Sequence, residues 1–499
     1  MTADRQATGK LISHGSIYLL GNILRRAISF IMLPIYTRYL TTEDYGTLEL
    51  LTMIIDFVAI IVGLRISEGI FRFYGQYAAQ AEKDQVVSTA MIMIFILNLV
   101  GCALVALFRE PLSLLMFGDT GTSFYILLFA VTIIFQGLIE VPLVFIRNLQ
   151  LPWHFIFFSI CKLALQLGLN IYFVVIRQMH VEGVIYSALI SGGIMSLVLV
   201  WYTLAKTGLH LSPAKAKELL QFSLPLIFTS LITFYITFGD RYFLRLFSGL
   251  SEVGIYALGY KFGFLLMFLV VEPFSNIWNS EKYRVYQQAD AKKIFQNVFL
   301  AFSLAIILVF VGISLFVKDV LMIMSIPTFW PAYKVVPVIL MAYALNAWVY
   351  YANFGILIQK KTIEITYGTI IAAVFVTLGY VLLIPPFGAL GAAWATVLAF
   401  GSRCAWVTIR SAKLYDMGLP WGTVGGLAAY AVLIVWAGSV LITTDQLLVS
   451  VAAHCGLALV FLGGLLLLPI LPAPWRRELR KNFFRPWQML RSPAEMRSG

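Results

Sequence analysis

Two adjacent arginines stand inside the first long apolar run of this chain. Residues 14–38 read HGSIYLLGNILRRAISFIMLPIYTR, and Arg25 and Arg26 lie near the middle of the run. An arginine at the centre of a bilayer costs from about 2.5 to well over 10 kcal/mol, so a helix retains one only where it faces a protein interior or water. At 100° per residue, both arginines fall on the same side of the helix as Asn22. The pattern predicts a cationic, hydrogen-bonding wall that binds an anionic ligand.

A second group of charges ends the second apolar run. Arg65, Glu68 and Arg72 are spaced at i, i+3 and i+7, which puts them on one face of a helix. One interpretation is a carboxylate neutralised by two arginines, and the other is a cytoplasmic gate whose ion pairs break during transport. Glu68 and Asp56 are also the candidate partners for the arginines of the first run, if those form an internal ion pair.

Asp240 and Arg241 end the seventh predicted span. Adjacent residues do not face each other on a helix, so we expect no simple mutual pair and predict that Asp240 meets a group on another helix. The two interpretations are a structural role at the outer interface and a contact of an extracytoplasmic gate.

Lys261 is isolated among apolar residues of the eighth predicted span, which makes it a candidate ligand-binding residue; the alternative is that it pairs with an acid. Glu272, eleven residues on, projects to nearly the same face of a continuous helix. Asp56, Glu140 and Glu272 are the buried acids that would bind a proton or Na⁺ for energy coupling. Passive neutralisation of nearby arginines is the alternative for all three.

The elements that must position these charges are membrane helices. Hydrophobic residues make up 60% of the 499 residues, charged residues 12%, and the mean hydropathy is +0.88. Such a composition excludes a soluble globular protein and predicts an all-α integral membrane protein. About fourteen spans are expected, at 14–38, 45–75, 86–108, 123–146, 154–176, 181–205, 218–240, 253–278, 294–317, 332–358, 363–385, 388–411, 421–443 and 448–471.

The remaining reactive residues predict no metal site, cofactor or catalytic centre. The four cysteines and five histidines are scattered without metal-ligand spacing, and no phosphate-binding GxxxxGK[ST] motif occurs. The net charge of +12 follows membrane topology, not nucleic-acid binding, because Lys and Arg concentrate in alternate connections. This bias predicts an even number of spans with both termini in the cytoplasm. The basic tail either lies on anionic headgroups or is solvated without a specific role.

Two short matches share one offset in the sequence. EDYGTLEL around Gly46 resembles SEVGIYAL around Gly254, HVEGVIYSAL around Gly183 resembles GALGAAWATV around Gly391, and both offsets are 254 − 46 = 391 − 183 = 208 residues. This spacing predicts a duplicated six-helix unit, with two pseudo-symmetric lobes around a central cavity and two extra C-terminal helices. The expected parts are an N-terminal cytoplasmic segment (1–13), an N-lobe (14–206), an inter-lobe cytoplasmic loop (207–217), a C-lobe (218–412), helices 13 and 14 (420–471) and a cytoplasmic tail (472–499).

Two runs carry a family resemblance. GSIYLLGNILRRAISFIMLPIYTRYLTTEDYGTLELL and FSLPLIFTSLITFYITFGDRYFLRLFSGLSEVGIYALGYKF resemble the openings of the two halves of bacterial polysaccharide-exporter flippases, of the multidrug, oligosaccharidyl-lipid and polysaccharide exporter superfamily. The resemblance implies two six-helix lobes, alternating access and a polyprenyl-diphosphate-linked oligosaccharide as passenger. It also implies a role in O-antigen or exopolysaccharide synthesis at the bacterial plasma membrane, with polymerase and export machinery as candidate partners.

Three function classes follow from these expectations. The first is a lipid-linked oligosaccharide flippase, which changes no covalent bond and needs no catalytic residue. The second is an ion-coupled drug or cation antiporter of the same superfamily, against which the two arginines of the first run argue. The third is a membrane glycan polymerase or ligase, against which the short outer connections argue.

Overall fold

The computed structural model describes residues 30, 32–63, 65–442, 444 and 446–477. Every regular element in this part of the chain is a helix. Twelve helical segments of these residues are long and apolar enough to cross a membrane. One of them, α15 (Ile363–Leu414), contains two predicted spans, so the described residues account for the second to the fourteenth span. The predicted all-α integral membrane fold is confirmed.

The helices form two compact units. Unit 1 contains the described residues up to Ala257 together with Met324–Phe329 and Tyr380–Ala389, and unit 2 contains the rest. The boundary lies within α10 (Leu250–Leu266) and not at the predicted inter-lobe loop, because α9 packs against α2, α3 and α4.

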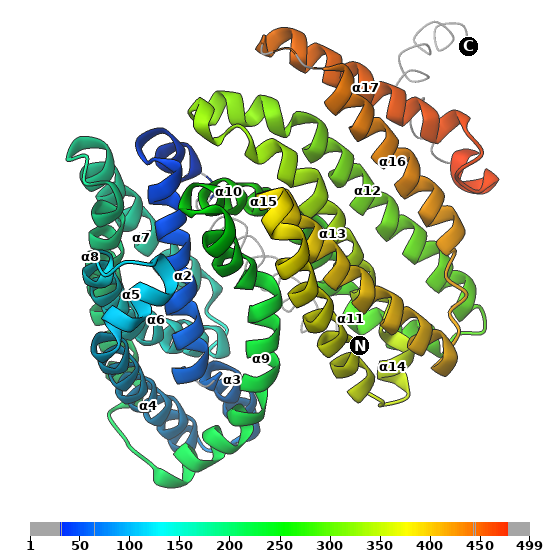
Figure 1. Cartoon of the computed structure of the whole chain (residues 1–499). Coiled ribbons are helices and arrows are strands. Elements are labelled where there is room, and N and C mark those ends of the chain that lie inside the picture. The colour runs from blue at the N-terminus through cyan, green and yellow to red at the C-terminus, as the bar shows by residue number, and fades with distance from the viewer. Residues whose placement is uncertain (1–29, 31, 64, 443, 445, 478–499) are drawn as a thin grey trace, which may run out of the picture. The chain divides into compact units, whose positions relative to one another are not determined.

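In unit 1, α6 packs between α4 and α8, and α7 lies against α8 (Figure 1). A core of fully buried side chains, including Ile66, Val87 and Val141, joins α3, α4 and α6. The helices that lie wholly in unit 1 are α2 (Thr42–Val62), α3 (Ile66–Gln76), α4 (Gln80–Leu107), α5 (Arg109–Phe117), α6 (Ser123–Asn148), α7 (Pro152–Asn170) with the π-helix η1 (Ile171–Ile176), α8 (His180–Thr207) and α9 (Pro213–Ser248).

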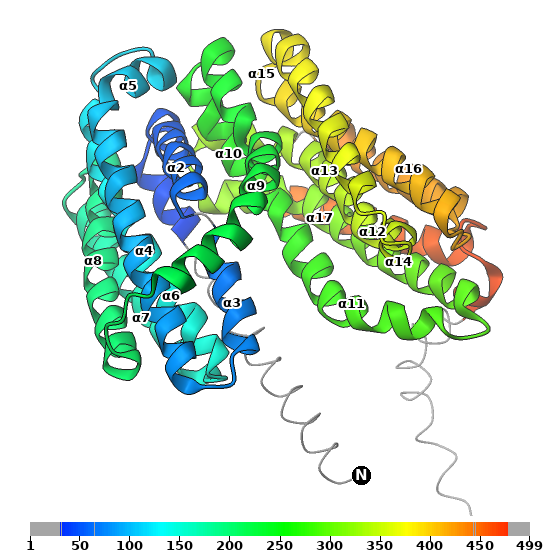
Figure 2. The ribbon, with the colours of Figure 1, turned by 90° about the horizontal axis from the view of Figure 1, so that it is seen from below.

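In unit 2, stacked aromatic rings of α11, α12 and α13 form much of the core; Phe274 and Phe302 have ring centroids 4.1 Å apart. Helices α16 and α17 lie alongside α12 in both views (Figures 1 and 2). After α10, the elements that lie wholly or mainly in this unit are η2 (Met267–Val271), α11 (Glu272–Tyr286), α12 (Ala291–Met324), α13 (Ala332–Ala352), α14 (Phe354–Ile358), α15, α16 (Trp421–Leu441) and α17 (Leu447–Leu467). The short η3 (Pro327–Phe329) belongs to unit 1.

Helix α15 joins two predicted spans through a kink. Pro385 and Pro386 remove two backbone donors from the helix, and Gly388 has a φ of 52°, a conformation that glycine adopts without steric cost. The predicted boundary between the spans, at residues 386–387, therefore coincides with a bend and not with a loop.

The predicted duplication appears as a pair of matching contacts in unit 1. A Cβ on Gly46 would lie 2.1 Å from the carbonyl oxygen of Leu250, and a Cβ on Gly254 would lie 2.0 Å from that of Thr42. Because 46 + 208 = 254 and 42 + 208 = 250, each contact maps onto the other. The beginnings of α2 and α10 thus pack against each other as equivalents, at a distance that only glycine permits.

A second pair of contacts obeys the same offset. The Asp44 carboxylate lies 3.2 Å from Nδ1 of His180, and the Glu252 carboxylate accepts a hydrogen bond of 3.2 Å from the Ala389 amide. Here 44 + 208 = 252, and His180 and Gly388, also 208 apart, both have positive φ values, of 46° and 52°. In each half, an acid at the start of the second span therefore contacts the start of the sixth.

The predicted inter-lobe loop is fixed to α4. The buried hydroxyl of Ser88 accepts a hydrogen bond of 2.8 Å from the His210 amide, and that of Thr89 accepts one of 3.1 Å from the Ser212 amide. Lys215 at the start of α9 lies 3.4 Å from Glu82. This connection is therefore part of the packed surface of unit 1.

Candidate functional site

Arg25, Arg26 and Asn22 lie outside the described residues. The site is therefore built from the helices that follow.

Unit 1 contains a cavity of about 270 Å³ within its membrane-spanning helices. This volume has room for a phosphate group or one sugar ring and not for a whole oligosaccharide, since pockets that hold drug-sized ligands begin near 300 Å³. Its polar lining comes from α2, the turn after α2, α3, α4 and α6. The polar residues are Asp56, Arg65, Ser67, Asn98, Gln136 and Glu140.

The cavity brings together three residues that the sequence analysis considers separately. Asp56 and Glu140, two of the predicted coupling acids, line it together with Arg65. Glu140 is exposed and not buried as predicted, because it stands on the cavity wall at the last turns of α6. The cavity thus offers both signs of charge.

A break after α2 presents Arg65. Helix α2 ends at Val62 with Gly63 as its C-cap, and Arg65 adopts a left-handed conformation (φ 53°) as the N-cap of α3. Its guanidinium lies 3.4 Å from Glu68, and each side chain is about half exposed. The predicted Arg65–Glu68 contact is confirmed, as a solvent-accessible pair that is worth at most about 1 kcal/mol. Such a pair costs little to break.

Arg72 does not share this carboxylate. Its guanidinium lies 4.7 Å from the ring centroid of Phe222 and 5.7 Å from that of Phe73, and among the described residues it forms no ion pair. The interpretation of one acid neutralised by two arginines is therefore wrong, because the break before α3 turns Arg65, but not Arg72, toward the cavity.

Asn98 and Gln136 are cavity residues that the sequence analysis missed. The Asn98 amide donates a hydrogen bond of 3.1 Å to the Ile133 carbonyl, and this close approach needs Gly137, where a Cβ would lie 2.1 Å from Asn98 Nδ2. The available signals were an amide in the middle of an apolar run and the i, i+4 spacing of Gln136 and Glu140 on α6.

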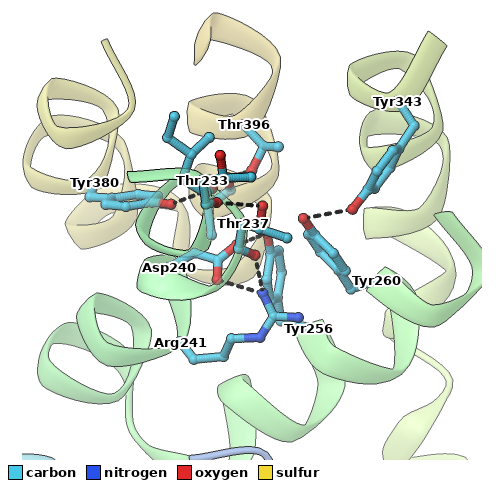
Figure 3. A network of polar contacts seen from close by, with 11 residues as sticks. Thr233, Thr237, Asp240, Arg241, Tyr256, Tyr260, Tyr343, Tyr380 and Thr396 are labelled. Atoms are coloured by element: carbon cyan, nitrogen blue, oxygen red, sulfur yellow. Dashed lines mark hydrogen bonds and ion pairs between the residues drawn. The ribbon is translucent and has the colours of Figure 1, made fainter. Parts of the chain in front are cut away.

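Asp240 and Arg241 form a buried network in unit 1, which Figure 3 shows. Contrary to prediction they pair directly: Arg241 Nη1 lies 2.6 Å from Asp240 Oδ1 and also donates to the carbonyl of Thr237, one turn earlier. The long arginine side chain folds back along α9, which makes a contact between adjacent residues feasible. The prediction that Asp240 meets another helix is confirmed, because it accepts a hydrogen bond from the Tyr256 hydroxyl of α10.

This network is not at the end of its helix. Helix α9 continues to Ser248, two turns past the predicted boundary at Asp240, because its apolar residues extend that far. Asp240 and Arg241 are 0% and 2% exposed. Both charges are thus inside the protein.

Lys261 and Glu272 lie in unit 2. Both are half-buried, and the π-helical turn η2 stands between them. A π-helical turn adds a residue per turn, so a spacing of eleven residues does not define one face here. The prediction of a shared face therefore rests on a helix that the structure interrupts.

One polar cluster of unit 2 was not anticipated. The His454 ring on α17 lies 2.7 Å from Asp319 on α12, and the Ser450 hydroxyl also donates to that carboxylate. All three are buried, so they fasten α17 to α12 (Figure 1). No group of three or more His, Cys, Asp or Glu residues in the described ranges is arranged to hold a metal ion.

Comparisons with known proteins agree with this architecture. The family described as polysaccharide biosynthesis protein matches residues 11–278, more than half of the chain. The search of curated proteins found no match to this chain.

Among solved structures, the lipid II flippase MurJ in an inward closed conformation aligns with a TM-score of 0.71 at 13% identity, covering 94% of this chain and 99% of the other. An inward-facing multidrug resistance MATE family transporter of the MOP superfamily aligns with a TM-score of 0.61 at 15% identity, covering 78% and 95%. The MATE transporter VcmN of Vibrio cholerae gives 0.53 at 14% identity, covering 84% and 99%. The chain therefore belongs to the polysaccharide biosynthesis protein family and has the fold of MOP-superfamily transporters.

Proposed function

We propose that this protein is a flippase that moves a polyprenyl-diphosphate-linked oligosaccharide from the cytoplasmic to the outer leaflet of the bacterial plasma membrane. The movement proceeds by alternating access and supplies units for a surface polysaccharide such as an O-antigen or exopolysaccharide. The family match, and the fold shared with a solved flippase named for lipid II, support this choice over other membrane protein classes.

The observation that carries the proposal is the polar cavity of unit 1 inside membrane-spanning helices. A flippase must carry a hydrated, charged headgroup across about 30 Å of hydrocarbon. The guanidinium of Arg65 and the amides of Asn98 and Gln136 replace water around phosphate and hydroxyl groups, while the lipid tail stays in the bilayer. No bond is made or broken, so the protein acts as a transporter and not as an enzyme.

The predicted site residues other than Arg72, Asp240 and Arg241 take a role in this transport. Arg25, Arg26, Asn22 and Lys261 bind the headgroup. Arg65 and Glu68 form a gate contact, since their solvent-exposed ion pair breaks at low cost. The coupling acids are Asp56, Glu140 and Glu272, which exchange a proton or Na⁺.

One observation favours a second candidate, an ion-coupled drug or cation antiporter. Asp56 and Glu140 line the same cavity, and two acids near one another suit a cationic passenger. Deletion of the gene separates the candidates. A flippase deletion accumulates unpolymerised lipid-linked repeat units in the cytoplasmic leaflet, an antiporter deletion gives drug sensitivity, and loss of a polymerase or ligase leaves single units exposed outside.

The headgroup role is tested by the double variant Arg25→Ala, Arg26→Ala in the deletion strain. We expect export of glycan to stop while the variant still reaches the membrane in normal amount. Arg284→Ala is the matched control, because Arg284 forms an exposed i, i+3 ion pair with Glu281 at 2.6 Å, outside the cavity. Full export by the double variant would refute the role of the two arginines.

A further inference from the structure

One arginine of unit 2 stands on the interior face of a membrane-spanning helix. Arg403 follows Ala392, Thr396 and Ala399 at spacings of 11, 7 and 4 residues, which puts all four on one face of the second half of α15. Ala392, Thr396 and Ala399 are completely buried. The opposite face carries the exposed side chains Trp394, Leu398 and Ile409. Arg403 therefore points toward the protein and not toward lipid.

This arginine lacks a counter-charge. Its Nε is buried and has no hydrogen-bond partner, and no carboxylate of the described residues pairs with it. The titratable groups near it are the Tyr350 phenol and the Cys404 thiol, and neither is a carboxylate. The side chain as a whole is only half-buried, so part of the guanidinium is open to a ligand.

Two turns further along the same face, Arg410 shows what a structural arginine looks like in this helix. Its Nε donates to Glu364 Oε2 at 2.9 Å, and its Nη2 pairs with Glu364 Oε1. The guanidinium of Arg410 is thus paired with an acid of the first half of α15, whereas the guanidinium of Arg403 is not paired with an acid. Arg410 therefore serves as the control for Arg403 within the same helix.

Other polar atoms without partners lie along the same interval. Helix α13 and its continuation α14 run beside the second half of α15, from the Tyr343–Phe400 ring contact (5.8 Å) to the hydrogen bond from the Gly355 amide to Ser411 Oγ (3.0 Å). Between these two contacts lie the buried, unpartnered side-chain oxygens of Asn346 on α13, of Asn353 between α13 and α14, and of Thr408 on α15. Buried polar groups without partners are rare and each calls for a ligand or water.

We infer that Arg403 and Asn346 form a diphosphate-binding site of unit 2, which holds the headgroup of the lipid-linked passenger. This inference rests on the proposed function and adds residues to it. An unpaired arginine at bilayer depth is costly, and a diphosphate offers the bidentate oxygens that match a guanidinium fork. The side-chain NH₂ of Asn346 donates a hydrogen bond to the same group, since its amide oxygen, like the phosphate oxygens, only accepts.

The test uses the full-length protein in phosphatidylcholine nanodiscs, with binding measured by native mass spectrometry. The probes are undecaprenyl diphosphate, undecaprenol and inorganic diphosphate. We expect Arg403→Gln to weaken binding of undecaprenyl diphosphate on the order of tenfold or more and Arg403→Lys to weaken it less, because lysine keeps the charge without the fork. Asn346→Ala should cause a several-fold loss without removing a charge. Arg410→Gln should bind the lipid as wild type does.

The outcomes separate the two proposals. If wild type binds undecaprenyl diphosphate no better than undecaprenol, the flippase proposal and the site both fail. If wild type prefers the diphosphate and both Arg403→Gln and Asn346→Ala bind it equally well, only the site is refuted. If inorganic diphosphate binds as tightly as undecaprenyl diphosphate, the ligand of the site is free diphosphate and not the headgroup of a lipid. If Arg403→Gln is not recovered as a folded protein, Asn346→Ala and Arg403→Lys decide.

Discussion

At the scale of single residues, the described part of the chain places the arginines of its membrane helices in two kinds of surroundings. Asp240 and Arg241 neutralise each other inside unit 1, and Glu364 and Arg410 do so in unit 2. Arg65 faces a cavity, and Arg403 faces the interior without an acid. An arginine paired with an acid has a structural role, whereas an arginine inside a membrane protein without an acid is a candidate for ligand binding. The distinction depends on the neighbours and not on the residue type.

The Asp240–Arg241 pair leads to a prediction about stability. Asp240→Asn removes the carboxylate that lies 2.6 Å from the buried guanidinium of Arg241, which costs about 3–5 kcal/mol. We expect a clear fall in the melting temperature of the purified protein in detergent. The double variant Asp240→Asn, Arg241→Met should recover much of the loss, because it removes the buried charge as well. A double variant that is no more stable than the single one would contradict this account.

At the scale of elements, glycine decides how closely two helices approach. A methyl group at Gly46 would lie 2.1 Å from the Leu250 carbonyl oxygen, so α2 and α10 must separate to accept Gly46→Ala. We expect a loss of about 1–3 kcal/mol from overpacking, seen as a lower melting temperature, and the same for Gly254→Ala.

The control for these variants is Gly312→Ala in α12. No atom lies within 4 Å of a Cβ at this position, so alanine should keep or slightly raise stability through its better helix propensity. Equal melting temperatures for Gly46→Ala and Gly312→Ala would show that the close contact of α2 and α10 is not maintained.

The loop between α8 and α9 gives a second prediction at this scale. Ser88 and Thr89 hold its backbone by hydrogen bonds, each worth about 0.5–1.5 kcal/mol. Ser88→Ala, Thr89→Val should release the loop and raise the rate of trypsin cleavage after Lys206 several-fold or more. Ser439→Ala removes an exposed hydroxyl that bonds only within its own helix, and it should leave the cleavage rate unchanged.

At the scale of the whole molecule, the duplication and the charge bias together predict the topology. Thirteen described spans and the predicted first span make an even number, so we predict that both termini lie in the cytoplasm. A fluorescent reporter fused after residue 499 should therefore be active, and so should one fused after Lys361. An alkaline phosphatase reporter should instead be active when it is fused after Gly121. An active phosphatase at the C-terminus would mean an odd number of spans.

The repeat also shows how one fold is built from two unequal halves. Asp44 meets an imidazole where Glu252 meets a backbone amide, although the positions correspond at an offset of 208 residues. The polar cavity belongs to unit 1, whereas the unpaired Arg403 belongs to unit 2. The duplicated scaffold is thus shared, and the side chains that it presents are not.

The amino-acid sequence by itself determined the membrane class, the number and order of the spans, the repeat and the family. These features depend on the length of apolar runs and on local spacing, which a chain carries in one dimension. Helix ends and helix interruptions did not follow from these patterns: α9 continues past Asp240, and a π-helical turn separates Lys261 from Glu272.

Only the tertiary structure decided which charges meet. It paired Asp240 with Arg241, separated Arg72 from Glu68, and grouped Asp56, Arg65 and Glu140 around one cavity with Asn98. It also left Arg403 without an acid while it gave one to Arg410. Helical spacing fixes the face on which a side chain lies, but the partner comes from another helix, and helix packing alone sets that distance.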